Sequence, residues 1–116
     1  MDRAELGRQG ETATAALLEE RGFAIVGRNV RVGRLEIDLI ATRGRLLVFC
    51  EVRTRRTDAY GSPAETITPQ KASRVRRAGY AWAKENARGM KLRFDAAAVI
   101  LRPGHDAKID YYVDAF

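Results

Sequence analysis

Residues 35–53 read LEIDLIATRGRLLVFCEVR, and the fold class follows from this stretch. Residues 35–41 alternate between the two sides of an expected strand, whereas residues 46–53 form a nearly continuous apolar run. Such a run is typical of a strand that is covered on both faces. Residues 42–45, around Gly44, supply the turn between the two strands. We therefore predict a β-hairpin whose second strand is central in a sheet.

Two helices and three further strands flank this hairpin in the prediction. Helical spacing places a first helix over residues 4–21, with an expected buried stripe of Leu6, Gly10, Ala13 and Leu17. Thr68 and Pro69 begin a second helix, with an expected buried stripe of Ala72, Val75, Gly79 and Trp82. Further strands are expected at residues 23–31, 92–101 and 109–113. The order αβββαββ predicts an α/β fold, a mixed sheet flanked by helices, with residues 1–116 forming a single domain.

The sequence shows no membrane or export signal. No apolar run approaches the roughly 18 residues that a membrane-spanning helix needs. Residues 1–5 are charged and precede no apolar stretch, so we expect neither a signal peptide nor an anchor. Cys50 is the single cysteine and cannot form an internal disulfide. We therefore expect a cytoplasmic protein with no membrane partner.

Positive charge is concentrated in one part of the chain. Between Arg53 and Arg93, eleven Lys and Arg residues stand against Asp58, Glu65 and Glu85, so this segment carries +8 and the remainder −2 of the formal net charge of +6. Such a concentration suits a polyphosphate partner, because each phosphate that is neutralised releases counterions. A solvated, solubilising face explains the same charge equally well.

The residue types that are missing exclude most kinds of catalytic centre. The only histidine, His105, lies in an expected turn far from any nucleophile, and one histidine with one cysteine cannot form the usual zinc sites. The sequence contains no glycine-rich phosphate-binding loop. Catalysis would therefore depend on carboxylates with a hard divalent metal such as Mg²⁺.

Two acidic residues of the hairpin are the candidate metal ligands. If the hairpin pairs Asp38 with Phe49, Asp38 lies diagonal to Glu51, and a register shifted by two residues places the two carboxylates directly opposite. Either register puts Asp38, Glu51 and Arg53 on one face of the sheet. A carboxylate pair among apolar residues needs a compensating cation, either a metal or Arg53. The alternative is a structural ion-pair network between Glu51 and Arg53.

The motifs EIDLIA at residues 36–41 and VFCEVRTR at residues 48–55 resemble those of the small bacterial YraN family, known as UPF0102. The resemblance extends over nearly the whole chain through GRQGE at residues 7–11, GSP at residues 61–63, Lys71, and RFD at residues 93–95. That family resembles Holliday-junction resolvases and the PD-(D/E)xK nuclease superfamily. The resemblance implies a restriction-endonuclease-like fold, and it raises the chance of a homodimer.

The resemblance also implies a site for Mg²⁺ or Mn²⁺. In it, Asp38 and Glu51 are the metal carboxylates and Glu11 is an additional acidic residue from the first helix. Arg53 stands where the superfamily has lysine, and arginine keeps the positive charge but stays protonated and is bulkier. Lys71 would substitute for that lysine if its ammonium group reaches the site.

Basic residues near the carboxylate pair are candidates for contact with DNA. Such phosphate contacts would position nucleic acid without reading its sequence, and the candidates are Arg55, Arg56, Lys71, Arg74 and Arg77. Tyr60, in the basic loop, would either stack on an unpaired base or pack against the domain. Asp95 is expected to be a structural partner of a nearby arginine.

Three functions fit this sequence. The first is a metal-dependent endonuclease that hydrolyses phosphodiester bonds in DNA, with branched and single-stranded DNA among the candidate substrates. The second is a catalytically inactive nucleic-acid-binding module with a nuclease fold, a reading that Arg53 makes credible. The third is a protein-interaction domain whose positive face docks an acidic protein.

Overall fold

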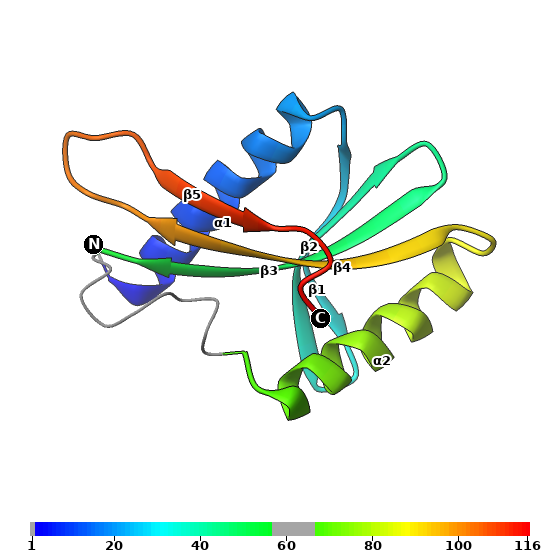
Figure 1. Cartoon of the computed structure of the whole chain (residues 1–116). Coiled ribbons are helices and arrows are strands. Elements are labelled where there is room, and N and C mark those ends of the chain that lie inside the picture. Colours follow the sequence, from blue (N-terminus) through cyan, green and yellow to red (C-terminus); the bar gives the residue numbers. More distant parts are fainter. Residues whose placement is uncertain (1, 57–66) are drawn as a thin grey trace.

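The computed structural model describes residues 2–56 and 67–116, which contain two helices and five strands (Figure 1). In chain order these are α1 (Arg3–Glu20), β1 (Ala24–Val32), β2 (Leu35–Arg43), β3 (Leu46–Arg55), α2 (Pro69–Asn86), β4 (Lys91–Ile100) and β5 (Lys108–Tyr112). Asp2 and Thr68 begin the two helices, because their side chains accept hydrogen bonds from backbone N–H groups of the first turn. The predicted order αβββαββ is confirmed.

The five strands form one sheet in the order β1-β2-β3-β4-β5. β3 and β4 run parallel and are connected through α2, whereas the other neighbouring pairs are antiparallel. The sheet is therefore mixed, and β3 lies at its centre, as its continuous apolar run predicts. This α/β architecture is compatible with a restriction-endonuclease-like fold.

The two helices pack against opposite faces of β3. Val48 and Cys50 belong to the core cluster that contains residues of α1, whereas Leu47 and Phe49 belong to the cluster that contains residues of α2. Successive side chains of a strand point to opposite faces, so β3 is buried on both. Acidic residues placed on this strand are therefore held in low-dielectric surroundings unless they lie near its end.

The buried face of α1 differs from the predicted stripe. Its buried residues are Gly10, Thr14, Ala15 and Leu18. Of the predicted stripe, Leu6, Ala13 and Leu17 are only half-buried. Gly10 sets the rotation of the helix, because a Cβ there would overlap the side chain of Thr54. Thr14 is buried because its hydroxyl donates to the carbonyl oxygen of Gly10 at 2.8 Å, and a search for apolar spacing misses such a residue.

The stripe predicted for α2 is largely correct. Val75 and Gly79 are buried, and a Cβ at Gly79 would lie 2.6 Å from the ring of Phe94. Trp82 is half-buried rather than fully enclosed, and its ring packs edge-on against Phe49 with centroids 6.1 Å apart. The helix thus lies close to β3 and β4 along its middle, which fixes the position of its first turn.

The register of the β2–β3 hairpin is shifted by two residues from the simpler prediction, which paired Asp38 with Phe49. Phe49 pairs instead with Ile40. The reason lies in the turn, where Gly44 occupies the first central position with a φ of 59°. Two-residue hairpin turns need positive φ at this position, and in the simpler register Arg43 would have to adopt it.

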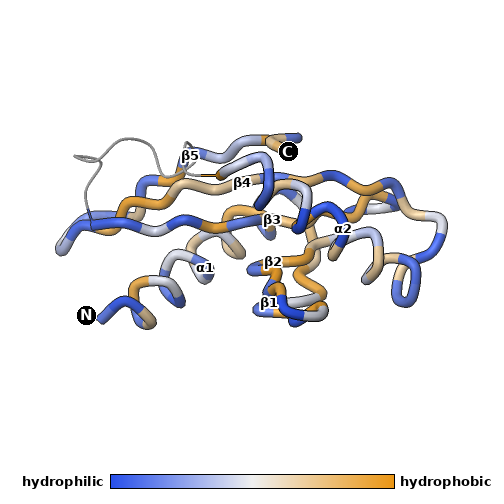
Figure 2. Tube along the Cα trace, turned by 90° about the horizontal axis from the view of Figure 1, so that it is seen from below, coloured by the Kyte–Doolittle hydropathy of each residue, from blue (hydrophilic) through white to orange (hydrophobic). Residues whose placement is uncertain are grey.

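β1 and β2 continue as a separate hairpin beyond the end of the β2–β3 ladder. β2 is paired with β3 only from Leu39 onward, whereas it is paired with β1 from Leu35. Figure 2 shows this pair of strands turning away from β3 and β4. A register shift in β1 between Ile25 and Gly27 is the kind of bulge that bends a strand. The sheet therefore forks at Asp38.

Candidate active site

Asp38 lies at the fork where β2 separates from β3. The ladder between the two strands ends at Leu39 and Cys50, and Oδ2 of Asp38 accepts a hydrogen bond from the backbone N–H of Val52 at 2.8 Å. The carboxylate therefore replaces a backbone acceptor that β2 no longer supplies. If the pairing of Leu39 with Cys50 is extended by one residue, Asp38 lies opposite Glu51. This is the arrangement expected for the register shifted by two residues.

Asp38 and Glu51 form a carboxylate pair on the face of the sheet that α2 covers. Glu51 is only 3% exposed and shares this face with Phe49, two residues before it. Burial, followed by the charge of Glu51, raises the pKa of Asp38 to about 7. Both effects disfavour a second negative charge at this point, and a nearby cation would compensate that charge.

The ammonium group of Lys71 reaches this pair from α2. Its Nζ lies 2.9 Å from Oε1 of Glu51. Thr68 caps the helix by accepting a hydrogen bond from the N–H of Lys71 at 3.1 Å, which places Lys71 in the first turn. The ammonium group of Lys71 therefore contacts Glu51, one of the two candidate metal carboxylates.

Three buried side-chain polar atoms have no hydrogen-bond partner within residues 2–56 and 67–116. They are Oε2 of Glu51, Nε of Arg53 and Oγ1 of Thr54. A buried polar atom without a partner costs about 1–3 kcal/mol, so such atoms in a folded chain need an explanation. Oε2 of Glu51 and the carboxylate of Asp38 are the oxygen donors that hard divalent cations prefer. The residues present therefore fit Mg²⁺ or Mn²⁺ held between Asp38 and Glu51.

Glu11 is engaged elsewhere. Its Oε1 accepts a hydrogen bond from Nδ2 of Asn29 at 3.1 Å and lies 3.7 Å from Nε of Arg28. Its charge nevertheless contributes to the raised pKa of Asp38, after burial, Glu51 and the hydrogen bond from Val52. Within the part of the chain that the structure describes, no three His, Cys, Asp or Glu side chains are grouped so as to hold a metal. The structure thus brings together Asp38 and Glu51 but leaves Glu11 with β1.

Arg53 lies on the same strand as Glu51 and pairs with Ala98 of β4 across the parallel ladder. It is the second residue after Glu51, so both side chains leave the strand on one face. The ion pair that Glu51 forms with a described residue is to Lys71. The structural network between Glu51 and Arg53, considered from the sequence, is therefore not formed.

The predicted phosphate contacts come from two elements. Arg74 and Arg77 are exposed on α2, Arg55 is half-buried at the end of β3, and Arg56 is exposed directly after it. Tyr60 lies outside the described residues. Arg74 is one helical turn beyond Lys71, so α2 carries a row of cations that begins at the carboxylate pair.

Asp95 is a structural residue, as predicted. It is fully buried, and its carboxylate accepts hydrogen bonds from Nε and Nη2 of Arg93 at 3.0 and 2.9 Å. The hydroxyl of Tyr111 and the backbone N–H of Asp114 also donate to it. The hydrogen bond to Asp95 raises the pKa of Arg93. Every oxygen of Asp95 is thus occupied by the fold itself.

Comparison with known proteins identifies relatives across the chain. A family model described as "Uncharacterised protein family UPF0102" matches residues 10–99, which include β2, β3 and α2. A UPF0102 protein of Leifsonia xyli is 50% identical over 80 residues, covering 69% of this chain and 68% of the relative. Another, of Rhodococcus opacus, is 42% identical over 112 residues, or 96% of this chain and 95% of the relative. A third, of Dictyoglomus turgidum, is 36% identical over 118 residues and covers 100% of both chains. In the described residues, no helix is long and apolar enough to cross a membrane.

Proposed function

This chain belongs to the protein family UPF0102, and from the geometry of its own residues we propose that it hydrolyses DNA as a metal-dependent endonuclease. One observation carries the proposal. A carboxylate pair with a raised Asp38 pKa has a partnerless oxygen, Oε2 of Glu51, and lies within contact of the Lys71 ammonium group. Buried like charges beside a cation are typical of sites where charged groups do chemistry.

Each side chain has a separate role in this proposal. Asp38 and Glu51 would hold Mg²⁺ or Mn²⁺ through carboxylate oxygens, and a bound metal would supply Lewis-acid polarisation of the phosphate and a more acidic water. Lys71 provides a positive charge from α2 to stabilise the negative charge that develops on the phosphate. Arg53, which stays protonated, contributes charge but cannot accept a proton from water.

Nucleic acid is the proposed partner because of where the basic residues lie. Lys71, Arg74 and Arg77 lie on α2, whose first turn contacts Glu51 through Lys71. Arg55 ends the strand that carries Glu51. A phosphate chain bound along these residues would pass the carboxylates. The proposed partner is therefore DNA in the cytoplasm, and no membrane partner is proposed.

Cleavage assays with matched variants test the proposal. Labelled duplex, single-stranded and junction DNA are incubated with the purified protein in Mg²⁺ or Mn²⁺. We expect cleavage in the parent, none with Asp38→Asn, and a loss of about 100-fold or more with Lys71→Ala. Glu36→Gln removes an exposed carboxylate from the same strand and should leave cleavage unchanged. Failure to cut any of these substrates, or equal cutting by Asp38→Asn, contradicts the proposal.

A second candidate function is a nucleic-acid-binding module without turnover. Arg53 favours it, because the resemblance to the nuclease superfamily implies a lysine at this position, and because the Nε of Arg53 has no described partner. In that case the parent binds DNA with a steep salt dependence and does not cleave it. Including Arg53→Lys in the same assays separates the two functions, since cleavage by this variant alone indicates a nuclease that has lost its lysine.

A further inference from the structure

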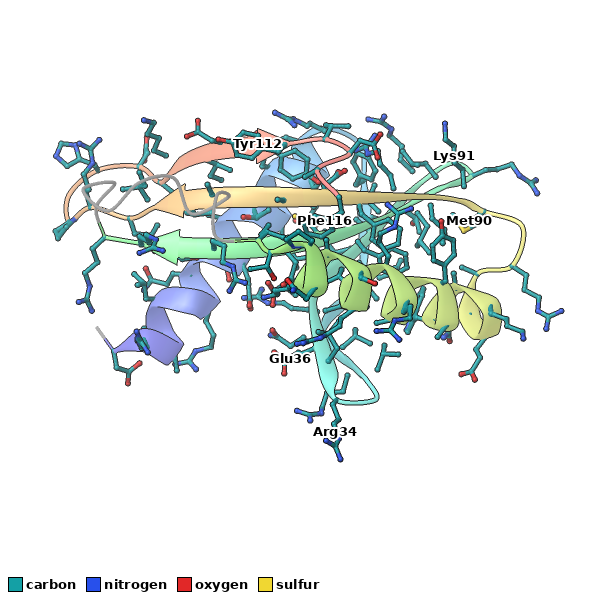
Figure 3. All side chains as sticks on the ribbon, turned by 60° about the horizontal axis from the view of Figure 1, so that its bottom comes forward. Arg34, Glu36, Met90, Lys91, Tyr112 and Phe116 are labelled. Atoms are coloured by element: carbon teal, nitrogen blue, oxygen red, sulfur yellow. The ribbon has the colours of Figure 1, made fainter. Side chains whose placement is uncertain are left out.

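A groove lies between the tip of the β1–β2 hairpin and the outer side of α2. Its volume is about 610 Å³, and it is lined by Val32, Gly33, Arg34, Leu35, Arg74, Arg77 and Ala78. Figure 3 shows Arg34 at the tip of this hairpin, beyond Glu36 on β2. Arg34 comes from a segment far from α2 in sequence, so the groove exists only because the hairpin folds toward the helix.

The two walls of the groove are fixed relative to each other. Val32 and Leu35, which flank the turn, pack against the core cluster that contains Val75 and Ala78 of α2. The turn itself is tight, because Val32 pairs with Leu35 and Gly33 takes a φ of 61°. Arg34 is therefore presented from a rigid hairpin rather than from a loose loop.

The charges around the groove are all of one sign. The guanidinium groups come from Arg34, Arg74 and Arg77, and no carboxylate from residues 2–56 or 67–116 lines the groove. None of the three forms an ion pair with another residue of the described chain. Three cations gathered around a hollow repel one another, and a bound anion with several oxygens relieves that repulsion and accepts their forked hydrogen bonds.

Both walls of the groove continue to the carboxylate pair, because α2 carries Lys71 and β2 carries Asp38. Lys71 and Arg77 are six residues apart on α2, or about 9 Å along its axis. Arg34 and Asp38 are four residues apart, or about 13 Å along an extended strand. Both lengths are within the reach of a few successive nucleotides of one DNA strand, whose phosphates advance by about 3.4 Å per nucleotide along the duplex axis and also wind around it.

We infer that Arg34, Arg74 and Arg77 form a phosphate-binding groove for the backbone of the DNA substrate, within a few nucleotides of the phosphate that would be cleaved beside Asp38 and Glu51. This inference rests on the proposed function and extends it, because the hairpin adds a second wall that the α2 row alone lacks. Contacts of this kind set the register of the nucleic acid at the carboxylates without reading its sequence.

Salt-dependent binding tests this inference without requiring cleavage. Binding of a short labelled duplex is measured by fluorescence anisotropy in EDTA at several salt concentrations. Arg34→Ala, Arg74→Ala and Arg77→Ala combined should lower the slope of log affinity against log salt by about 2–3, since each phosphate contact contributes about 0.9. The control combines Arg3→Ala, Arg45→Ala and Arg102→Ala, which removes the same charge from exposed positions on other elements and should change the slope by less than about 1.

The possible outcomes separate this inference from the proposed function. Equal slope changes in the two triple variants, or no DNA binding by the parent, overturn the groove. Binding of polyglutamate in place of DNA overturns it as well and indicates an acidic protein partner. If the parent cleaves DNA but the groove variant keeps the salt slope of the parent, the proposed function stands and the groove is rejected. If the groove variant changes the slope but the parent neither binds Mn²⁺ nor cleaves DNA, the groove stands and the nuclease function is rejected. Circular dichroism of all variants checks that they are folded.

Discussion

Two acidic side chains are buried to nearly the same degree on the neighbouring strands β3 and β4, yet their surroundings differ. Asp95 is 0% exposed, and its oxygens accept hydrogen bonds from Arg93, Tyr111 and Asp114. Glu51 is 3% exposed, has one ion pair, and keeps one oxygen without a described partner. Burial alone therefore does not distinguish a structural carboxylate from a functional one.

The distinction lies in how each charge is compensated. A network in which every polar atom is satisfied stabilises a single conformation, and removing one member leaves the others unpaired. A carboxylate pair with a partnerless oxygen is instead held by the surrounding core at some cost to stability. The fold tolerates this cost at Asp38 and Glu51 because the core clusters on both faces of β3 are well packed.

Removing Asp95 should have the largest effect on stability. Asp95→Ala leaves Arg93 and the hydroxyl of Tyr111 without their buried acceptor, so we expect the free energy of unfolding to fall by about 3–5 kcal/mol. Urea denaturation measures this change. Asp110→Ala, which truncates an exposed aspartate on the adjacent strand β5, is the control and should change stability little. Equal stability of the two variants would contradict the structural role of Asp95.

Replacing Asp38 should have a smaller effect, of opposite sign. The pKa of Asp38 is about 7 in the folded chain, above its ordinary value of 3.8 in an unfolded chain. The folded chain therefore holds this proton more tightly, and its stability falls as the pH rises from about 4 to about 7. Asp38→Asn removes this dependence, so the variant should be more stable than the parent at pH 8 in EDTA.

Denaturation at two pH values checks this prediction. The advantage of Asp38→Asn should be present at pH 8 and nearly absent at pH 4. An asparagine oxygen still accepts the hydrogen bond from Val52, so the end of the β2–β3 ladder is kept. Glu36→Gln should show no comparable pH dependence, because Glu36 is exposed. A variant that is less stable than the parent at pH 8 would show that the carboxylate pair is structural.

Local patterns in the sequence predicted the elements and their order, because periodicity and turn residues act over a few neighbours. The strand at residues 46–53 was identified as central from its apolar run alone, and it is β3. The simpler hairpin register was wrong because it ignored which turn position needs glycine. With Gly44 placed first in the turn, the same reasoning leads to the observed register.

Contacts between distant segments were harder to predict. The pairing of Glu11 with Arg28 and Asn29 depends on how α1 lies across β1, which no local pattern encodes. The groove beside Arg34 depends on how far the β1–β2 hairpin bends away from β3. Lys71 was identified as a candidate, but its contact with Glu51 follows from the parallel β3–α2–β4 connection, which returns the helix over the same face.

Lys71 provides the smallest of the expected stability effects and the sharpest test of the comparison between Asp95 and Glu51. Lys71→Met removes the ion pair of Glu51 while keeping the apolar part of the side chain. Since Lys71 is 28% exposed, we expect a loss of only about 1 kcal/mol in EDTA, compared with Lys84→Met on the exposed side of the same helix.

Saturating Mn²⁺ should reverse this loss, because a cation between the carboxylates compensates Glu51, whereas it should not restore Asp95→Ala. DNA cleavage should remain low even with Mn²⁺, since the metal does not replace the charge that Lys71 places beside the phosphate. If Mn²⁺ stabilises neither the parent nor Lys71→Met, Glu51 resembles Asp95 and its partnerless oxygen is not a metal ligand.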